Sequence, residues 1–273
     1  MDEQVDLQRQ FDDKGFIVTA TGVDNDLCDQ LHQSLVSFAA AMKNLVSFKY
    51  GPNANSIAIS TVNIQNHFLQ FVGINGFYRY YMNLGLAKSL LENPAGLLRD
   101  LEFGYGTSTK QVSKNSRIPS KILLPTIETM APTLQAAPEL LVATGYPEAS
   151  ILNPSVVSSI RIGFTYYDLH ARVNGLKRYK HKHEHNSGLD IFLKLDSSES
   201  EVLVGDAEKD PNVVLQGRGD NVVMDGKRQL VHCPVVDGNP RSSMIAFVPA
   251  SLRSEYLRNH GIGPYVSLDR PLR

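Results

Sequence analysis

Hydrophobic positions in the first fifty residues change from a short apolar run to a helical repeat. Residues 15–20 are mostly apolar, which predicts a short buried strand. Asp24 or Asn25 can cap the helix that follows. The next apolar positions recur every three or four residues, which predicts one helical stripe facing the core. These positions are Leu27, Leu31, Leu35, Phe38, Met42 and Leu45.

The pattern up to residue 150 is less regular but favours helices. A strand is expected at residues 56–64. The aromatic cluster at residues 77–82 could line a pocket or pack against a helix, and we favour packing. Helices are expected over residues 85–91, from Pro94 to about Phe103, and over residues 127–143. Pro132 and Pro138 should interrupt the last of these. Residues 1–150 are therefore expected to form a mainly helical support region.

Beyond Pro154 the chain becomes a series of short apolar or alternating segments with turn residues between them. The segments that fit strands are 156–167, 178–195, 201–205, 212–216, 221–224, 230–235 and 243–248. Such a series is typical of a sandwich or barrel of the jelly-roll kind. Helices first and strands second argue against a doubly wound fold. We therefore expect one α+β domain over 1–273, with its jelly-roll core at 151–250 and a C-terminal segment at 251–273.

Composition narrows the possible partners. The chain has 273 residues, of which 42% are hydrophobic, and a net charge of -1. Such a charge argues against a general attraction to nucleic acid or to an anionic membrane. The only cysteines, Cys28 and Cys233, do not form a disulfide framework, which favours a reducing cytoplasm. No signal peptide or membrane-spanning run is apparent. We expect a cytoplasmic protein that acts on a small molecule.

Histidines alternate along one of the expected strands. His181, His183 and His185 would project from one face of that strand, because side chains in a strand alternate with period two. Glu184 would project from the other face. His232 follows 47 residues after His185 and could complete a set of three imidazole ligands. The pattern therefore predicts a metal site.

With the segment around Arg241, these histidines give a resemblance to a known family. Residues 183–193, 219–226, 231–234 and 241–247 are similar, in order and spacing, to motifs of the iron(II)- and 2-oxoglutarate-dependent oxygenases, including the isopenicillin-N-synthase-like branch. The resemblance implies a double-stranded β-helix and a metal triad of the form His-x-Asp/Glu…His. It also implies that Arg241 and Ser243 bind 2-oxoglutarate. The expected reaction is the oxidation of a small molecule, such as an amino-acid derivative or a natural-product intermediate.

The sequence departs from that family at one metal ligand. His185 stands where the family has a carboxylate, so we expect iron(II) to be held by His183, His185 and His232. Asp190 could replace His185 if the strand bends after Gly188. A third neutral imidazole adds one unit of positive charge to the site and could raise its affinity for copper. We do not expect halogenation, because His185 would fill the space that halide needs.

Two other interpretations stay open. The spacing of His183, His185, Asp190 and His232 also resembles a cupin, which would be a three-histidine dioxygenase that does not use 2-oxoglutarate. The other interpretation is a binding relative whose metal triad has decayed.

The substrate leaves few signals in the sequence. Tyr166, Tyr167 and His170 follow the strand that would flank the cosubstrate, and they could contact substrate or serve only in packing.

Overall fold

The computed structural model describes residues 2–50, 56–61, 69–74, 76–96, 103–106, 120–168, 187–205, 212–228, 230–234 and 239–263. These residues form helices and antiparallel strands, and the strands are arranged in two sheets. Within the described ranges, no helix combines the length and the apolar character that crossing a membrane requires.

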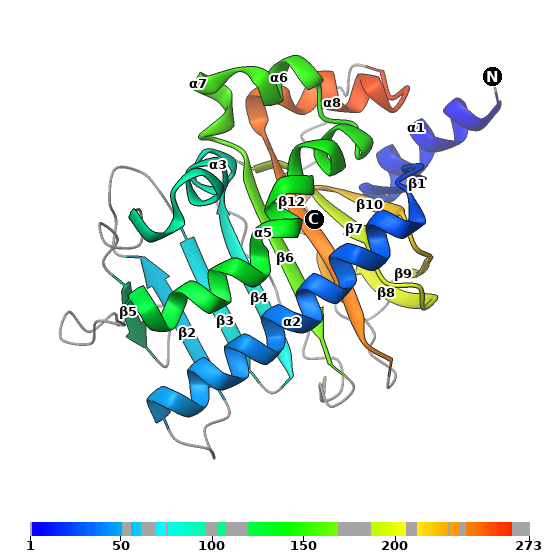
Figure 1. Cartoon of the computed structure of the whole chain (residues 1–273). Coiled ribbons are helices and arrows are strands. Elements are labelled where there is room, and N and C mark those ends of the chain that lie inside the picture. The colour runs from blue at the N-terminus through cyan, green and yellow to red at the C-terminus, as the bar shows by residue number, and fades with distance from the viewer. Residues whose placement is uncertain are drawn as a thin grey trace.

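The larger sheet combines strands from both halves of the chain. Its order is β1-β10-β7-β12-β6-β4-β3-β2-β5, and all neighbours are antiparallel. The strands are β1 (Phe16–Ala20), β2 (Ser56–Thr61), β3 (Leu69–Ile74), β4 (Phe77–Asn83), β5 (Phe103–Gly106), β6 (Arg161–Tyr167), β7 (Ser187–Lys194), β10 (Asp220–Asp225) and β12 (Arg241–Pro249). The C-terminal half supplies the centre, and β2 to β5 extend one side (Figure 1).

The smaller sheet has the order β11-β8-β9. Its strands are β8 (Ser200–Gly205), β9 (Asn212–Gln216) and β11 (Val231–Pro234). One apolar cluster joins the two sheets, because Val202, Val204 and Val214 of the smaller sheet pack with Val222 and Met224 of β10. The chain therefore passes repeatedly between two sheets that face one another.

Helices cover the other face of the larger sheet. The helices are α1 (Asp2–Lys14), α2 (Asn25–Tyr50), α3 (Leu84–Glu92), α5 (Ser120–Ala143), α6 (Glu148–Leu152), α7 (Pro154–Val157) and α8 (Arg253–Asn259), with 3-10 turns η1 (Gly226–Arg228) and η2 (Ala250–Leu252). The helices α2 and α5 run side by side across the sheet (Figure 1). The predicted stripe of α2 is confirmed, and Phe38 packs edge-on against Tyr80 of β4 with ring centroids 4.7 Å apart.

The helix α5 differs from its prediction. It continues through Pro125, Pro132 and Pro138, although breaks were expected at the last two of these. A proline removes one backbone hydrogen bond and disfavours the preceding turn, but tertiary packing can outweigh that cost. Here α5 is buried along α2, and Ser34 Oγ of α2 donates a hydrogen bond to the carbonyl of Thr129 at 2.6 Å. The contact with α2 therefore compensates for the prolines.

The N-terminal half contains more strand than the pattern predicted. Strand β1, strand β2 and helix α3 confirm the expectations at residues 15–20, 56–64 and 85–91. The prediction that helix would reach Phe103 was wrong, since Phe103 begins β5. Helix α1 and strands β3, β4 and β5 were not predicted. Support for the site therefore comes from strands as well as helices.

The predicted strand at residues 156–167 begins later in the structure. Pro154 occupies the first turn of α7, and its preceding Asn153 accepts a hydrogen bond from the Ser155 amide at 3.0 Å. Proline is well suited to the first turn of a helix, because its fixed φ is already helical. Strand β6 therefore starts at Arg161 and keeps the alternating part of the predicted segment.

Candidate active site between the two sheets

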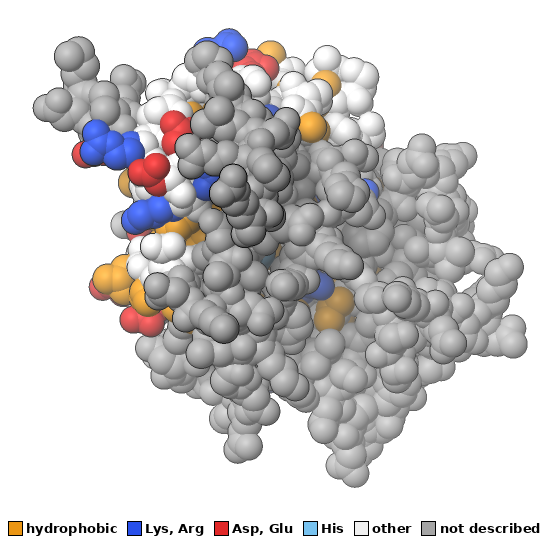
Figure 2. All heavy atoms as spheres, turned by 180° about the vertical axis from the view of Figure 1, so that it is seen from behind, with side chains coloured by type: hydrophobic (Ala, Val, Ile, Leu, Met, Phe, Trp, Pro, Cys, Tyr) orange, Lys and Arg blue, Asp and Glu red, His pale blue; other side chains and the backbone are white. Residues whose placement is uncertain are grey.

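A cavity of about 280 Å³ lies between the larger and the smaller sheet. Its wall on the larger sheet comes from β3, β4, β6, β7, β10 and β12, and the smaller sheet contributes Val202 and His232. Seen from the side opposite α2 and α5, a basic side chain is visible beside a hydrophobic one (Figure 2). The cavity is small for a ligand site, which favours small ligands.

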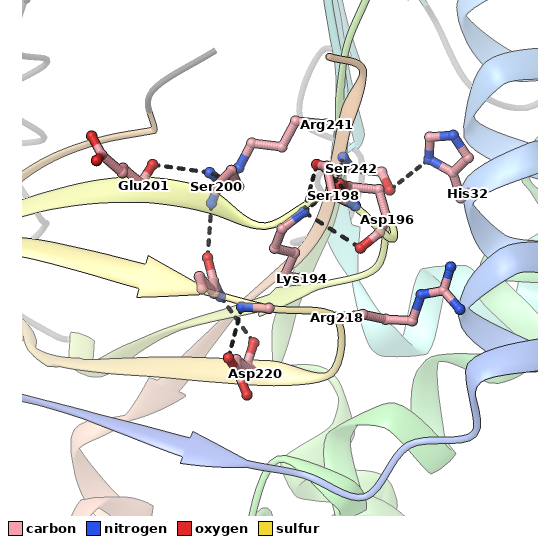
Figure 3. Close-up of polar contacts among 12 residues, drawn as sticks. His32, Lys194, Asp196, Ser198, Ser200, Glu201, Arg218, Asp220, Arg241 and Ser242 are labelled. Carbon is pink, nitrogen blue, oxygen red and sulfur yellow. Dashed lines mark hydrogen bonds and ion pairs between the residues drawn. The ribbon is translucent and has the colours of Figure 1, made fainter. Parts of the chain in front are cut away.

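Arg241 crosses from the larger sheet to the smaller one. It begins β12 and lines the cavity, and its side chain is buried. Its Nη1 donates to Ser200 Oγ at 2.7 Å and to the carbonyl of Glu201 at 3.1 Å, while its Nη2 donates to Gln216 Oε1 at 2.8 Å (Figure 3). These contacts with β8 and β9 fix the position and the plane of the guanidinium in the cavity wall.

Ser243 continues the same face of β12. It lines the cavity two residues after Arg241, and its Oγ lies 2.6 Å from Thr165 Oγ1 on β6. The register places Lys194, Ser243, Thr165 and Arg79 in one row across β7, β12, β6 and β4. Of this row, Ser243, Thr165 and Arg79 line the cavity and can donate to or accept from a polar ligand, whereas Lys194 does not line it.

Behind this row lies a second polar group, which reaches α2. Asp196 accepts hydrogen bonds from Lys194, Ser198 and the Ser242 amide, the last at 2.8 Å (Figure 3). Burial lowers the pKa of Lys194. Burial also opposes the ionisation of Asp196, but these hydrogen bonds outweigh it and lower the pKa of Asp196. The Ser242 Oγ lies 2.9 Å from His32 Nδ1, so the group connects the start of β12 to α2.

His232 faces the cavity from β11 and is buried. Its ring lies 4.7 Å from the ring of Phe192, measured between centroids. Its Nδ1 is 3.4 Å from the carbonyl of Leu230. A carbonyl can only accept, so in this contact the proton is on Nδ1. That arrangement is the one by which a second contact orients a metal-binding imidazole.

Two of the predicted metal ligands and one predicted substrate contact belong to a segment outside the described residues. His183, His185 and His170 lie outside the described residues. In the described part of the chain, no three His, Cys, Asp or Glu side chains are close enough to hold a metal. Asp190, the alternative ligand, is buried in the paired part of β7 and is not among the residues that line the cavity.

The two predicted tyrosines lie on opposite faces of β6. Tyr167 lines the cavity, with its ring centroid 4.8 Å from that of Phe77. Tyr166 lies on the helix side, where its ring is 5.9 Å from that of His32. Of these two tyrosines, Tyr167 is therefore the one placed to touch a ligand in this cavity.

Among the described residues, three arginines line the cavity, and of these only Arg241 was predicted. Arg79 and Arg161 come from β4 and β6, and Thr165 was also missed. A signal for Arg79 was present, because period-two alternation within residues 77–82 puts Phe77, Arg79 and Tyr81 on one face. The aromatic cluster thus does both things considered for it, since Tyr78 and Tyr80 pack on the helix side.

Comparison with known proteins gives likeness only at the level of structure. No protein-family model and no curated protein matches the sequence. A solved structure of a full-length Neurospora crassa protein, in complex with alpha-KG and 5-formyluracil, is 12% identical, with 91% of this chain and 78% of that chain covered and a TM-score of 0.49. A dioxygenase for auxin oxidation from rice is 12% identical, with 91% and 78% covered and a TM-score of 0.45.

A prolyl hydroxylase from Trichoplax adhaerens, in complex with a peptide fragment of hypoxia inducible factor, is 8% identical, with 93% of this chain and 92% of that chain covered and a TM-score of 0.39. At such low identities and TM-scores, the function of this chain has to be inferred from its own residues.

Proposed function

We propose that the protein is a non-haem iron(II) oxygenase that uses 2-oxoglutarate to oxidise a small molecule in the cavity between its sheets. One observation carries the proposal. His232, Arg241 and Ser243, which resemble separate motifs of that superfamily, come from both sheets and line the same cavity. A shared cavity is what the chemistry needs, because the metal ligand and the carboxylate-binding group must reach one cosubstrate.

The scaffold that we infer is a double-stranded β-helix. Its support is the path of the chain, in which β6 and β7 belong to the larger sheet, β8 and β9 to the smaller sheet, and β10, β11 and β12 alternate between the sheets. Functional side chains on such strands are held by hydrogen-bonded neighbours on both sides, which gives a site its fixed geometry.

His183, His185 and His232 would hold the metal. His232 fits this role, since it lines the cavity and its Nδ1 contacts the carbonyl of Leu230, a contact of the kind that orients metal-binding imidazoles. Imidazole is a suitable ligand for iron(II). The bound metal would supply the site where oxygen takes two electrons from 2-oxoglutarate, which becomes succinate and carbon dioxide, and two from a substrate C–H bond, which becomes C–OH. One oxygen atom goes to each organic product, so atoms and electrons balance.

Arg241 would bind the far carboxylate of 2-oxoglutarate. A planar guanidinium matches a carboxylate with two parallel hydrogen bonds, and such charge-assisted bonds are stronger than neutral ones. The contacts with Ser200, Glu201 and Gln216 fit that role, because a fork that is already positioned loses less freedom on binding. Ser243 and Thr165 present hydroxyls beside it.

His185 changes the charge of the proposed centre. A neutral imidazole in place of a carboxylate leaves the metal centre more positive by one unit. The expected consequences are tighter binding of the dianionic cosubstrate and a greater tolerance for copper.

Turnover of 2-oxoglutarate tests the proposal. The protein is supplied with iron(II), 2-oxoglutarate and oxygen, with a panel of small molecules, and succinate and oxygen are measured together. We expect iron-dependent succinate formation that a chelator stops. Oxygen consumption that does not require 2-oxoglutarate would favour the cupin-type dioxygenase. No iron binding and no consumption of either reactant would favour the decayed binding relative.

A further inference from the structure

A second guanidinium lies in the cavity wall, away from Arg241. Arg79 is on β4, and β6 separates it from β12. Neighbouring strands are about 4.8 Å apart, so the backbones of β4 and β12 are separated by about 10 Å. Arg79 and Arg241 therefore lie on different parts of the cavity wall, with the hydroxyls of Thr165 and Ser243 between them. The exposed Arg161, which begins β6, also lines the cavity.

Aromatic rings surround Arg79. Its guanidinium carbon lies 4.5 Å from the ring centroid of Tyr81 and 5.3 Å from that of Phe77. Both rings line the cavity, as do the rings of Tyr167 and Phe247. Stacking between rings holds a guanidinium in place but leaves the edge of its plane available for hydrogen bonds.

The described residues leave one hydrogen-bond donor of Arg79 without an acceptor. Its Nη1 donates to the Tyr81 hydroxyl at a long 3.4 Å. Its Nε is buried, and among the described residues it has no hydrogen-bond acceptor. A buried donor without an acceptor is uncommon in native proteins and calls for an explanation, such as a bound group. Burial raises the pKa of Tyr81, so this hydroxyl stays neutral beside the cation.

We propose that Arg79 binds the carboxylate of the substrate, and that the substrate is a small carboxylic acid with a flat apolar body. The carboxylate supplies a hydrogen-bond acceptor for the guanidinium and a charge opposite to that of Arg79. The apolar body packs among Phe77, Tyr81, Tyr167 and Phe247, and the small volume of the cavity limits its size. This inference rests on the proposed function, since it names the class of molecule that is oxidised. It gives 2-oxoglutarate and the substrate separate anion sites, at Arg241 and Arg79.

Matched acid and amide probes test this inference without requiring turnover. The probes are 3-phenylpropionate and benzoate, each paired with its neutral amide, and affinity is measured by calorimetry with saturating 2-oxoglutarate present. We expect the parent protein to bind at least one acid tenfold or more tightly than its amide. Arg79→Met should remove this preference, and Arg79→Lys should keep part of it because the charge remains. Arg258→Gln, on the exposed side of α8, is the control and should keep it fully.

The two anion sites can be told apart. Arg241→Met should keep the preference for the acid probe, and loss of the preference in that variant but not in Arg79→Met would overturn the inference. Failure of every acid probe to be preferred by the parent would also overturn it. Succinate formation by a parent that shows no such preference would leave the proposed function standing and remove only the role of Arg79. Acid binding through Arg79 without any use of 2-oxoglutarate would do the reverse.

Discussion

Nη2 of Arg241 lies 2.8 Å from Oε1 of Gln216, so a side chain of the larger sheet is bound directly to one of the smaller sheet. The amide nitrogen of Gln216 in turn donates to the carbonyls of Phe192 at 2.8 Å and Asp220 at 2.9 Å. Gln216 is fully buried, and its orientation is set by these two acceptors. The position of Arg241 therefore depends on backbone groups of β7 and β10 as well as on its own strand.

Replacing Arg241 by Lys should weaken binding of 2-oxoglutarate while leaving metal binding unchanged. Lysine keeps the charge but cannot form the planar pair of hydrogen bonds, and it cannot reproduce the contacts with Ser200 and Gln216. Loss of a charge-assisted pair is typically worth about 1.5–3 kcal/mol, or roughly tenfold to a hundredfold in affinity. Anaerobic calorimetry with 2-oxoglutarate on the iron-loaded protein measures the change. An unchanged affinity would separate Arg241 from cosubstrate binding.

Replacing His185 by Asp should keep iron and change how it binds the cosubstrate. The substitution restores the carboxylate of the family pattern and lowers the charge of the proposed centre by one unit. We expect the absorption band of the anaerobic iron–2-oxoglutarate complex to shift and the turnover rate to change. Spectrophotometric titration of parent and variant gives the comparison. If only the variant binds iron and forms succinate, the parent is a decayed relative.

Replacing Asp225 by Ala should destabilise the fold strongly. Both oxygens of Asp225 accept hydrogen bonds from Arg253, at 3.0 and 3.1 Å, and both side chains are buried. Removing one partner of such a pair leaves a buried charge uncompensated, which typically costs about 3–5 kcal/mol in the free energy of unfolding. Urea denaturation measures it. In the double variant with Arg253→Met, much of the loss should be recovered, and a purely additive effect would argue against the pair.

Acid should destabilise the protein partly through His32. Burial lowers the pKa of His32 in the folded state, so the unfolded state binds more protons as the pH falls through about 6.5. The free energy of unfolding should therefore fall between neutral pH and the lowered pKa of the folded state. His32→Gln should flatten that dependence, measured by urea denaturation from about pH 7.5 to about pH 5. Parallel curves for parent and variant would assign the acid sensitivity to other groups.

Local patterns were sufficient for the parts of the fold that bury one regular face. Periodicity identified α2 and most of the strands from β6 to β12, because a helical stripe or a strand alternation of apolar residues can be read directly from the sequence. It failed at α5, where prolines argued for breaks that packing on α2 overrides. It also failed at β3 and β4, because strands with bulky residues on both faces do not alternate clearly between polar and apolar positions.

Some residues of the site could also be predicted from the sequence, and others could not. The order and spacing of the motifs predicted His232, Arg241 and Ser243 as site residues, and all three line the cavity. Arg79 could not be joined to them from the sequence, because its neighbourhood depends on the pairing of β4 with β6 and of β6 with β12. Strand order is set by the tertiary fold and leaves no mark in the spacing of single residues.

The metal content of the His232→Ala variant tests the central claim most directly. Parent, His232→Ala and the control His260→Ala are purified, loaded anaerobically with iron(II), freed of unbound metal and shown to be folded. His260 suits the control because its Nδ1 contacts the carbonyl of Tyr256 in α8, and it does not line the cavity. We predict one iron per chain in the parent and in His260→Ala, and none in His232→Ala. A folded His232→Ala variant that retains one iron per chain would contradict the account.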